Sequence, residues 1–191
     1  MARPYFATEP WLFEQIMQAI ALSIQQSAVS VQQSAISQET LVQAGLQDFT
    51  FIDLGSGKGR VLLMASEYPF NRIIGVEFMP EWHRLAEANI HKFAAASPGA
   101  PPIESLCLDA RDFAFPAELL VIYMFNPFAE PVFAAIMERL RKSLLKKPRP
   151  VFVAYRYLEF ESLLEKCDWL EKVAGTKQWA VYRHLPFGGS K

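Results

Sequence analysis

The sequence is poor in cysteine, in net charge and in long apolar runs. Its 191 residues contain only two cysteines, Cys107 and Cys167, which excludes a disulfide-rich scaffold. Both lie in apolar stretches, so we expect buried core thiols. The net charge is −1, and without a positive field over the whole chain nucleic acid is not the expected partner. Histidines, cysteines and carboxylates lack the spacing of metal ligands, so we expect no metal site.

Membrane features are also absent from the sequence. No apolar run is long enough to span a bilayer. The first ten residues, MARPYFATEP, lack the apolar core of a signal peptide. We therefore expect a cytoplasmic protein without a membrane partner.

Residues 1–48 are predicted to form a helical N-terminal extension, with helical spacing of apolar residues from position 10 onward. A direct repeat follows, SIQQSAV at 23–29 and then SVQQSAI at 30–36. Its apolar positions recur at steps of four, three and four, which places them on one stripe of a helix. Two heptads are too few to predict a coiled coil. A helix packed on the domain is favoured, and a homodimer seam through this helix is the less favoured alternative.

Residues 49–191 alternate between apolar runs and amphipathic segments, which predicts an α/β domain. The apolar runs are continuous, as in parallel strands buried on both faces. The βαβ alternation implies a doubly wound, mostly parallel sheet with right-handed crossovers. The expected strands are 49–54, 72–78, 103–108, 119–125 and 150–157, with a C-terminal antiparallel hairpin over 169–185, and the expected helices are 60–68, 80–96, 129–147 and 159–167.

The loop after the first expected strand, FIDLGSGKGR, is the most informative stretch of the chain. Asp53 ends the strand and is followed by glycines at steps of two, Gly55, Gly57 and Gly59. Glycine lets a backbone turn tightly and approach a ligand closely. A nucleotide P-loop requires Lys-Ser or Lys-Thr after its last glycine, and the dinucleotide fingerprint requires a glycine where Arg60 stands, so neither matches. A glycine-rich turn without a ligand is the plain alternative.

The remaining pattern, acidic-x-G-x-G-x-G, resembles motif I of class I S-adenosylmethionine-dependent methyltransferases. Glu77 lies near the end of the second expected strand, where an acidic residue can accept hydrogen bonds from ribose hydroxyls. Asp109 follows the third strand and resembles the family's adenine-contacting position; taken alone it is equally a helix cap. The resemblance implies a seven-stranded sheet, S-adenosylmethionine as cofactor and S-adenosylhomocysteine as product. The cofactor-binding residues that it implies are Asp53, Gly55, Ser56, Gly57, Gly59, Glu77, Phe78, Asp109 and Ala110.

The fourth expected strand ends at Asn126-Pro127-Phe128. This stretch resembles the (Asp/Asn)-Pro-Pro-(Tyr/Phe) motif of amino-group methyltransferases, in which the Asn oxygen orients an amino group and the aromatic ring stacks on the substrate. The resemblance therefore implies catalytic roles for Asn126, Pro127 and Phe128. One proline is missing here, and two alternatives stay open: Asn126 caps the next helix, and Phe128 packs into the core.

Two further groups are candidates for the substrate side of the site. Tyr155, Arg156 and Tyr157 end the fifth expected strand and either line a substrate pocket or alternate on a half-buried strand. The N-terminal YFATEP is similar to the lead-in of small bacterial and lysine-directed seven-strand methyltransferases. That similarity implies a lid over the cofactor formed by Tyr5, Phe6 and Thr8.

We therefore predict a class I S-adenosylmethionine-dependent methyltransferase that acts on an amino or amide nitrogen, with protein lysine among the acceptors. Two alternatives remain. One is a small-molecule O- or N-methyltransferase, and the other is a non-catalytic module that binds S-adenosylmethionine or a partner. The substrate partner is accordingly either a protein or a small molecule.

Overall fold

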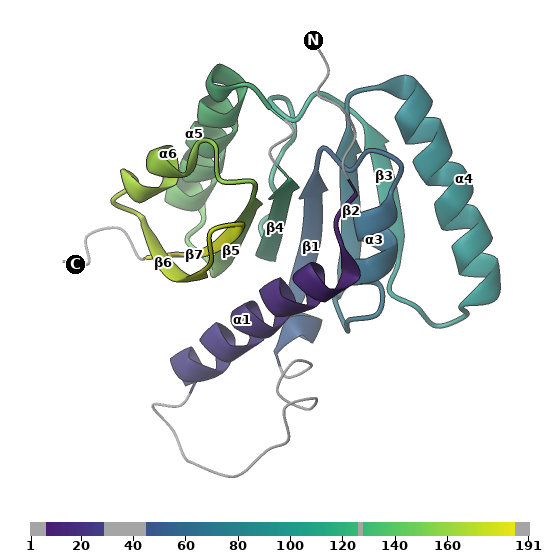
Figure 1. Cartoon of the computed structure of the whole chain (residues 1–191), viewed down its shortest axis with the longest axis horizontal. Helices are drawn as coiled ribbons and strands as arrows, with labels where there is room; N and C mark the ends of the chain where they lie inside the picture. The colour runs from purple at the N-terminus through teal and green to yellow at the C-terminus, as the bar shows by residue number, and fades with distance from the viewer. Residues whose placement is uncertain (1–6, 29–44, 126–127, 186–191) are drawn as a thin grey trace.

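The computed structural model describes residues 7–28, 45–125 and 128–185. Its centre is a seven-stranded sheet with the strand order β3-β2-β1-β4-β5-β7-β6. The first five strands in this order run parallel, and β7 is antiparallel to both of its neighbours. The predicted α/β fold with a C-terminal antiparallel hairpin is confirmed (Figure 1). The strands are β1 Phe49–Leu54, β2 Arg72–Glu77, β3 Ile103–Cys107, β4 Leu119–Phe125, β5 Val151–Arg156, β6 Leu170–Gly175 and β7 Trp179–His184.

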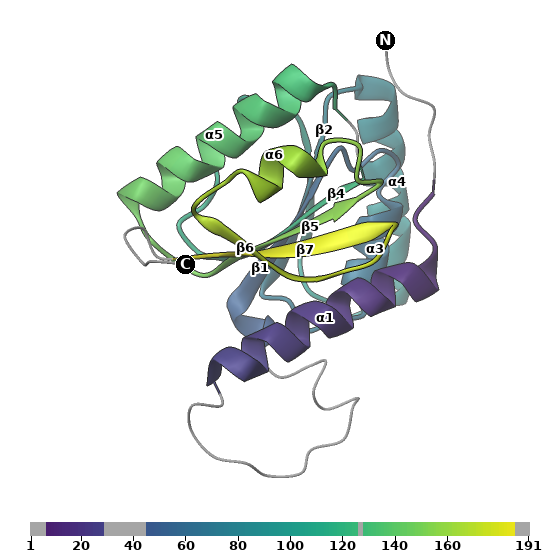
Figure 2. The same cartoon turned by 60° about the vertical axis from the view of Figure 1, so that its left-hand side comes forward.

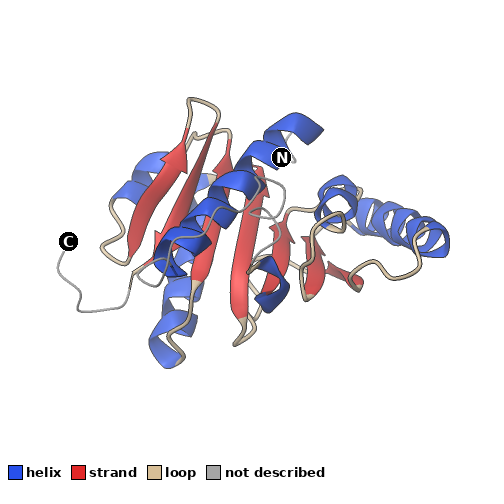
Figure 3. Ribbon diagram, turned by 90° about the horizontal axis from the view of Figure 1, so that it is seen from below, coloured by secondary structure: helices blue, strands red, loops and turns tan. Residues whose placement is uncertain are grey.

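Helices cover both faces of the sheet. Figure 2 shows α5 and α6 on one side of the strands and α1 on the other. Figure 3 shows the strands from below as one twisted layer between helices. The helices are α1 Pro10–Ala28, α3 Arg60–Ala65, α4 Pro80–Ala96, α5 Glu130–Lys146 and α6 Glu161–Glu165, with a 3-10 turn η1 at Leu46–Asp48. No helix among the described residues is long and apolar enough to cross a bilayer.

Alternating side chains of each strand feed two separate cores. On β1, Ile52 packs into the core beneath α5, whereas Phe51 packs into the core beneath α1. Helix α1 contributes five fully or almost fully buried apolar side chains to the second core. Burial of each of these side chains stabilises the fold by about 1.5–3 kcal/mol. The five are Leu12, Phe13, Ile16, Met17 and Ile20.

Phe13 fixes the position of α1 over the middle of the sheet. Its ring makes edge contacts with Phe51 on β1 and Tyr123 on β4, each with centroids 5.8 Å apart. Aromatic pairs in this geometry stabilise beyond their buried area. As a result, the residues just before α1 are held close to β4, at the carboxyl end of the sheet.

Two predictions need correction. The helical prediction over 10–48 is wrong at its end: the described helix α1 covers Pro10–Ala28, residues 29–44 lie outside the described part, and Gly45 has φ +91°, which an α-helix does not adopt. The second copy of the heptad repeat therefore lies outside the described residues. Cys107 is exposed because it ends the edge strand β3, and a run of apolar residues does not reveal whether its strand is central or at an edge. Cys167, which follows α6, is only half buried.

Candidate functional site

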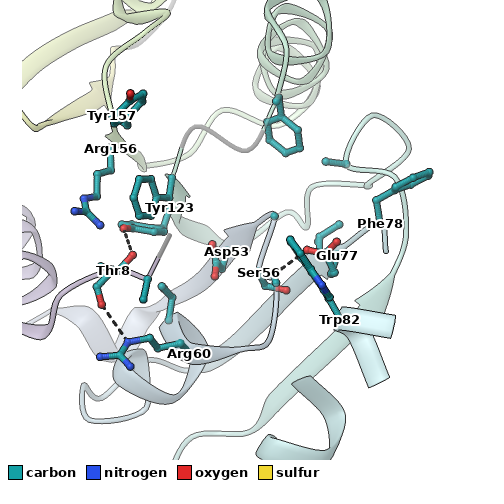
Figure 4. A pocket seen from close by; sticks show the side chains of 18 of the residues that line it. Thr8, Asp53, Ser56, Arg60, Glu77, Phe78, Trp82, Tyr123, Arg156 and Tyr157 are labelled. Atoms are coloured by element: carbon teal, nitrogen blue, oxygen red, sulfur yellow. Dashed lines mark hydrogen bonds between the residues drawn. The ribbon is translucent and has the colours of Figure 1, made fainter. Parts of the chain in front are cut away.

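A cavity of about 1370 Å³ opens at the carboxyl ends of the parallel strands. Ligands of doubly wound sheets bind beyond these ends, near the point where the strand order reverses. Here that point lies between β1 and β4, which pair with Asp53 opposite Tyr123. The volume exceeds the roughly 300–1,000 Å³ of ordinary small-molecule sites. There is room for a cofactor and for part of a second molecule (Figure 4).

The glycine-rich loop lines this cavity through Gly55, Ser56 and Gly57, whereas Gly59, also predicted to bind the cofactor, is not among the lining residues. Gly55, Gly57 and Gly59 have φ values of +86°, +54° and +82°. A side chain in this left-handed region costs about 1–2 kcal/mol per residue, so the alternate glycines have a conformational cause. The loop stays close to β2 because the amides of Gly55 and Ser56 both donate to the Val76 carbonyl oxygen, at 2.8 and 3.1 Å.

Glu77 joins the end of β2 to the glycine-rich loop. One carboxylate oxygen accepts from the Gly57 amide at 2.8 Å, and the other accepts from the Met79 amide at 2.8 Å. The side chain is buried yet lines the cavity. Each carboxylate oxygen has a second lone pair, so the ribose role predicted for Glu77 is compatible with both backbone bonds.

Asp53 lies at the end of β1 and faces the same cavity. Burial raises the pKa of its carboxyl well above the usual range, and the negative charge of Glu77 raises it further. A cation placed beside Asp53 would reverse this effect. The ammonium of an amino-acid tail, such as the methionine end of S-adenosylmethionine, is a cation of that kind.

The predicted adenine side of the cavity is lined by Asp109 and Ala110. Ala110 is buried. Both oxygens of Asp109 accept hydrogen bonds from the Arg111 guanidinium, and one also accepts from the Arg111 amide. These bonds hold the pKa of the Asp109 carboxyl below its usual value. Phe78 also lines the cavity, with its side chain largely exposed.

The opposite side of the cavity is lined by residues that follow β4 and β5. Phe125 and Phe128 line it, and Phe128 also packs partly against the core beneath α5. The Arg156 guanidinium lies 4.0 Å from the centroid of the Phe125 ring. Asn126 and Pro127 lie outside the described residues. The N-cap position of α5 is filled by Ala129.

Of the three candidates at the end of the fifth predicted strand, only Arg156 and Tyr157 line the cavity. Tyr155 is fully buried. Its ring packs 5.0 Å from that of Phe133, and its hydroxyl accepts from the Phe160 amide. Tyr155 is therefore a core residue, as the strand alternative predicted.

The segment before α1 crosses the edge of the cavity. The Thr8 hydroxyl is hydrogen-bonded to the Tyr123 hydroxyl at 2.8 Å, and the Thr8 carbonyl accepts from Arg60 Nε at 3.1 Å. Glu9 pairs with Arg156 at 2.5 Å. Thr8 thus lines the cavity, Tyr5 and Phe6 lie outside the described residues, and the lid stays a prediction.

Several cavity residues were not identified from the sequence. Trp82 is in the first turn of α4. Long side chains on a helix lean toward the N-terminus of that helix, so the position of Trp82 in the sequence could have predicted that its side chain lies near the end of β2. Arg60 directly follows the last glycine of the loop. Tyr123 offered no signal, because its partner Thr8 is 115 residues away. Lys177 and Gln178 come from the turn between β6 and β7 and also line the cavity.

The described residues fit S-adenosylmethionine. The glycine-rich loop permits close approach, Asp53 suits an ammonium and Glu77 suits a ribose. The hydroxyl of Ser56 is buried without a hydrogen-bond partner among the described residues, so a polar group at this loop remains to be satisfied. The individual ligand assignments stay predictions.

Comparisons with known proteins agree with the fold. The family model described as "Histone methylation protein DOT1" matches residues 29–97, which include the glycine-rich loop and Glu77. The candidate methylase HI0767 from Haemophilus influenzae is 13% identical, with a TM-score of 0.58 over 74% of this chain and 82% of that one. The PH0226 protein from Pyrococcus horikoshii is 15% identical, with a TM-score of 0.51 over 78% and 87% of the two chains.

A ribosomal protein L11 methylase from Lactobacillus delbrueckii subsp. bulgaricus is 17% identical, with a TM-score of 0.49 over 73% of this chain and 71% of that one. No curated protein matches the chain. The seven-stranded arrangement is the class I methyltransferase fold predicted from the sequence.

Proposed function

We propose that this S-adenosylmethionine-dependent methyltransferase transfers its methyl group to a nitrogen of a protein side chain, with the lysine amino group as the best-fitting acceptor. The observation that carries the proposal is the shared cavity. Phe125, at the end of β4, and Phe128 line the same cavity as Asp53 and Glu77. The segment between these two aromatic residues is the Asn126-Pro127 pair.

The sheet register supports a position for this segment beside the cofactor. Asp53 on β1 pairs with Tyr123 on β4. Two residues later the chains reach Gly55 and Phe125, and parallel strands advance together at about 3.3 Å per residue. The chain therefore leaves β4 beside the glycine-rich loop. A substrate held by residues after Phe125 would be close to the methyl group of a cofactor bound on that loop.

The cofactor supplies a methyl group activated by a positively charged sulfur. The chain has to bind the acceptor, exclude water and aim the attacking lone pair, which is catalysis by proximity and orientation. In the proposal, the Asn126 side-chain oxygen accepts a hydrogen bond from an amine N–H and so directs the lone pair. The apolar rings of Phe125 and Phe128 favour the neutral amine, because desolvation lowers an amine pKa.

A protein acceptor is supported by two observations. The matching family model carries the words "histone methylation", which name a protein acceptor for that family. In addition, two large aromatic side chains that line the cavity, Phe78 and Tyr157, are 65% and 63% exposed. Aromatic residues are enriched at protein–protein interfaces, so this rim suits a protein surface.

The test combines labelled S-adenosylmethionine with cell extract and asks which size fraction takes up the label. We expect labelled protein, with label stable to base as for an N-methyl group. Asn126→Ala should lower the labelling rate about a hundredfold through loss of alignment, with S-adenosylmethionine affinity unchanged by calorimetry.

Asn71→Ala is the matched control, because Asn71 is exposed and directly precedes β2 at the other end of the sheet. It should label protein at the wild-type rate. Label confined to small molecules would contradict a protein acceptor, and wild-type labelling by Asn126→Ala would contradict the role of Asn126. Binding without any transfer would contradict the enzymatic proposal.

A further inference from the structure

Tyr157 has an unusual backbone conformation at the edge of the cavity. It follows the last residue of β5 and has φ +63°, the only positive value for a non-glycine residue in the described part of the chain. Bulky residues are rare in this left-handed region because the Cβ atom crowds the backbone. Glycine adopts the same conformation without that cost.

Backbone hydrogen bonds on both sides hold Tyr157 in this conformation. Its amide donates to the Gln178 carbonyl oxygen at 3.0 Å, across the join to the turn between β6 and β7. Its carbonyl accepts from the Glu159 amide at 2.5 Å. The surrounding chain therefore dictates the backbone, and any residue at this position would have to adopt it.

The side chain of Tyr157 contributes little to folding. It is 63% exposed, whereas Tyr155, two residues earlier on β5, is fully buried between core residues. Strained residues that persist without a packing role concentrate at functional sites. A ring here rather than a glycine therefore points to a role outside the core.

The location of the ring indicates what that role is. Tyr157 lines the cavity next to Arg156 and Gln178. Figure 4 shows Tyr157 and Arg156 on one side of the cavity, with Phe78 and Trp82 on the other and Asp53 between them. Because Glu77 and the glycine-rich loop belong to the cofactor side, Tyr157 belongs to the side left for the acceptor.

We propose that Tyr157 contacts the methyl acceptor and is a specificity-determining residue for an aliphatic amine on a protein side chain; this rests on the proposed function. The ring offers a flat apolar surface for the methylenes of such a side chain. Its face also attracts the positively charged ammonium form of the amine as it approaches the cavity. The strained backbone presents the ring at the cavity instead of in the core.

Three variants separate the ring from the backbone. Tyr157→Gly removes the ring and relieves the strain, Tyr157→Asn removes the ring with a residue that tolerates left-handed φ, and Tyr157→Phe keeps the ring. The probe is soluble cell extract with tritium-labelled S-adenosylmethionine, with the initial rate of protein labelling measured at rising extract concentration.

We expect the glycine and asparagine variants to lose about tenfold in labelling rate at low extract concentration, as for an aromatic anchor. The loss should be smaller at saturating extract. Their melting temperatures should equal or exceed that of the wild type, and S-adenosylmethionine affinity should not change. Tyr157→Phe should stay within about twofold of the wild-type rate, since the contacting ring is retained.

The outcomes distinguish this inference from the proposed function. Wild-type labelling by Tyr157→Gly, with protein labelled by the wild-type enzyme, overturns the role of Tyr157 alone. A lower melting temperature of the glycine variant contradicts the strain argument. If the wild-type protein binds S-adenosylmethionine and labels no protein, the proposed function fails and the Tyr157 contact fails with it.

Discussion

Replacing Glu77 by glutamine tests how one carboxylate organises the cofactor site. In the structure the two oxygens accept from the Gly57 and Met79 amides, both at 2.8 Å. Glutamine retains one acceptor and turns an NH₂ group toward the other amide. One charge-assisted hydrogen bond is lost, which costs about 1.5–3 kcal/mol. For a chain of this length that corresponds to a fall in melting temperature of about 3–12 °C.

The same substitution should also weaken binding of the cofactor. If Glu77 also accepts from ribose hydroxyls, loss of at least one such bond costs a further 1.5–3 kcal/mol or so. The dissociation constant of S-adenosylmethionine should then rise about 10- to 150-fold. Calorimetric titration at a temperature well below the melting transition of the variant measures this change on folded protein.

Glu118→Gln is a matched control for Glu77→Gln. Glu118 also accepts hydrogen bonds, from Thr50 and Arg72, but these residues lie at the amino ends of β1 and β2, away from the cavity. Because this carboxylate is over a third exposed, we expect a small loss of stability and no change in cofactor affinity. Equal cofactor affinity for wild type and Glu77→Gln would refute the reasoning about the ribose.

Three more outcomes are expected. Because the pKa of Asp53 is raised, binding of S-adenosylmethionine should release a proton and tighten as pH rises. Calorimetry in buffers of different ionisation heat detects the released proton, and Asp53→Asn should abolish the release. Gly75→Ala places a methyl group 2.8 Å from the Ser56 hydroxyl oxygen. Urea unfolding should therefore show that the free energy of unfolding falls by about 1–3 kcal/mol, and calorimetry should show weaker cofactor binding. Burial lowers the pKa of the His184 imidazole, and its hydrogen bond to the Arg149 carbonyl opposes this effect in part. The folded state therefore favours the neutral ring, so the free energy of unfolding should fall as pH drops below about 6.5. This fall should be shallower in His184→Gln.

The central strands were predictable from the sequence because they are buried on both faces. The bounds of β1 and β4 match the prediction, and β5 differs by one residue at each end. The helix expected over 60–68 stops earlier, at Ala65. Pro69 disfavours helical backbone at the residue before it, so the last predicted turn had little support. The positions of Asp53 and Glu77 at the cavity follow directly from these strand ends.

Contacts between distant segments were not predictable. The bond between Thr8 and Tyr123 and the ion pair between Glu9 and Arg156 join residues more than 100 positions apart. Neither pair leaves a periodic signal in a single sequence. The left-handed backbone of Tyr157 was hidden for the same reason, because it depends on the turn between β6 and β7. Local patterns thus located the end of the cavity formed by the glycine-rich loop and Glu77 better than the end lined by Thr8, Arg156 and Tyr157.

A crystal structure of the complex with S-adenosylhomocysteine tests the central claim most directly. The account predicts one ligand molecule in the cavity, with its ribose within hydrogen-bond distance of the Glu77 carboxylate and its ammonium beside Asp53. Its sulfur should face the side lined by Phe128 and Tyr157. A ligand bound elsewhere, or a ribose without contact to Glu77, would contradict the account.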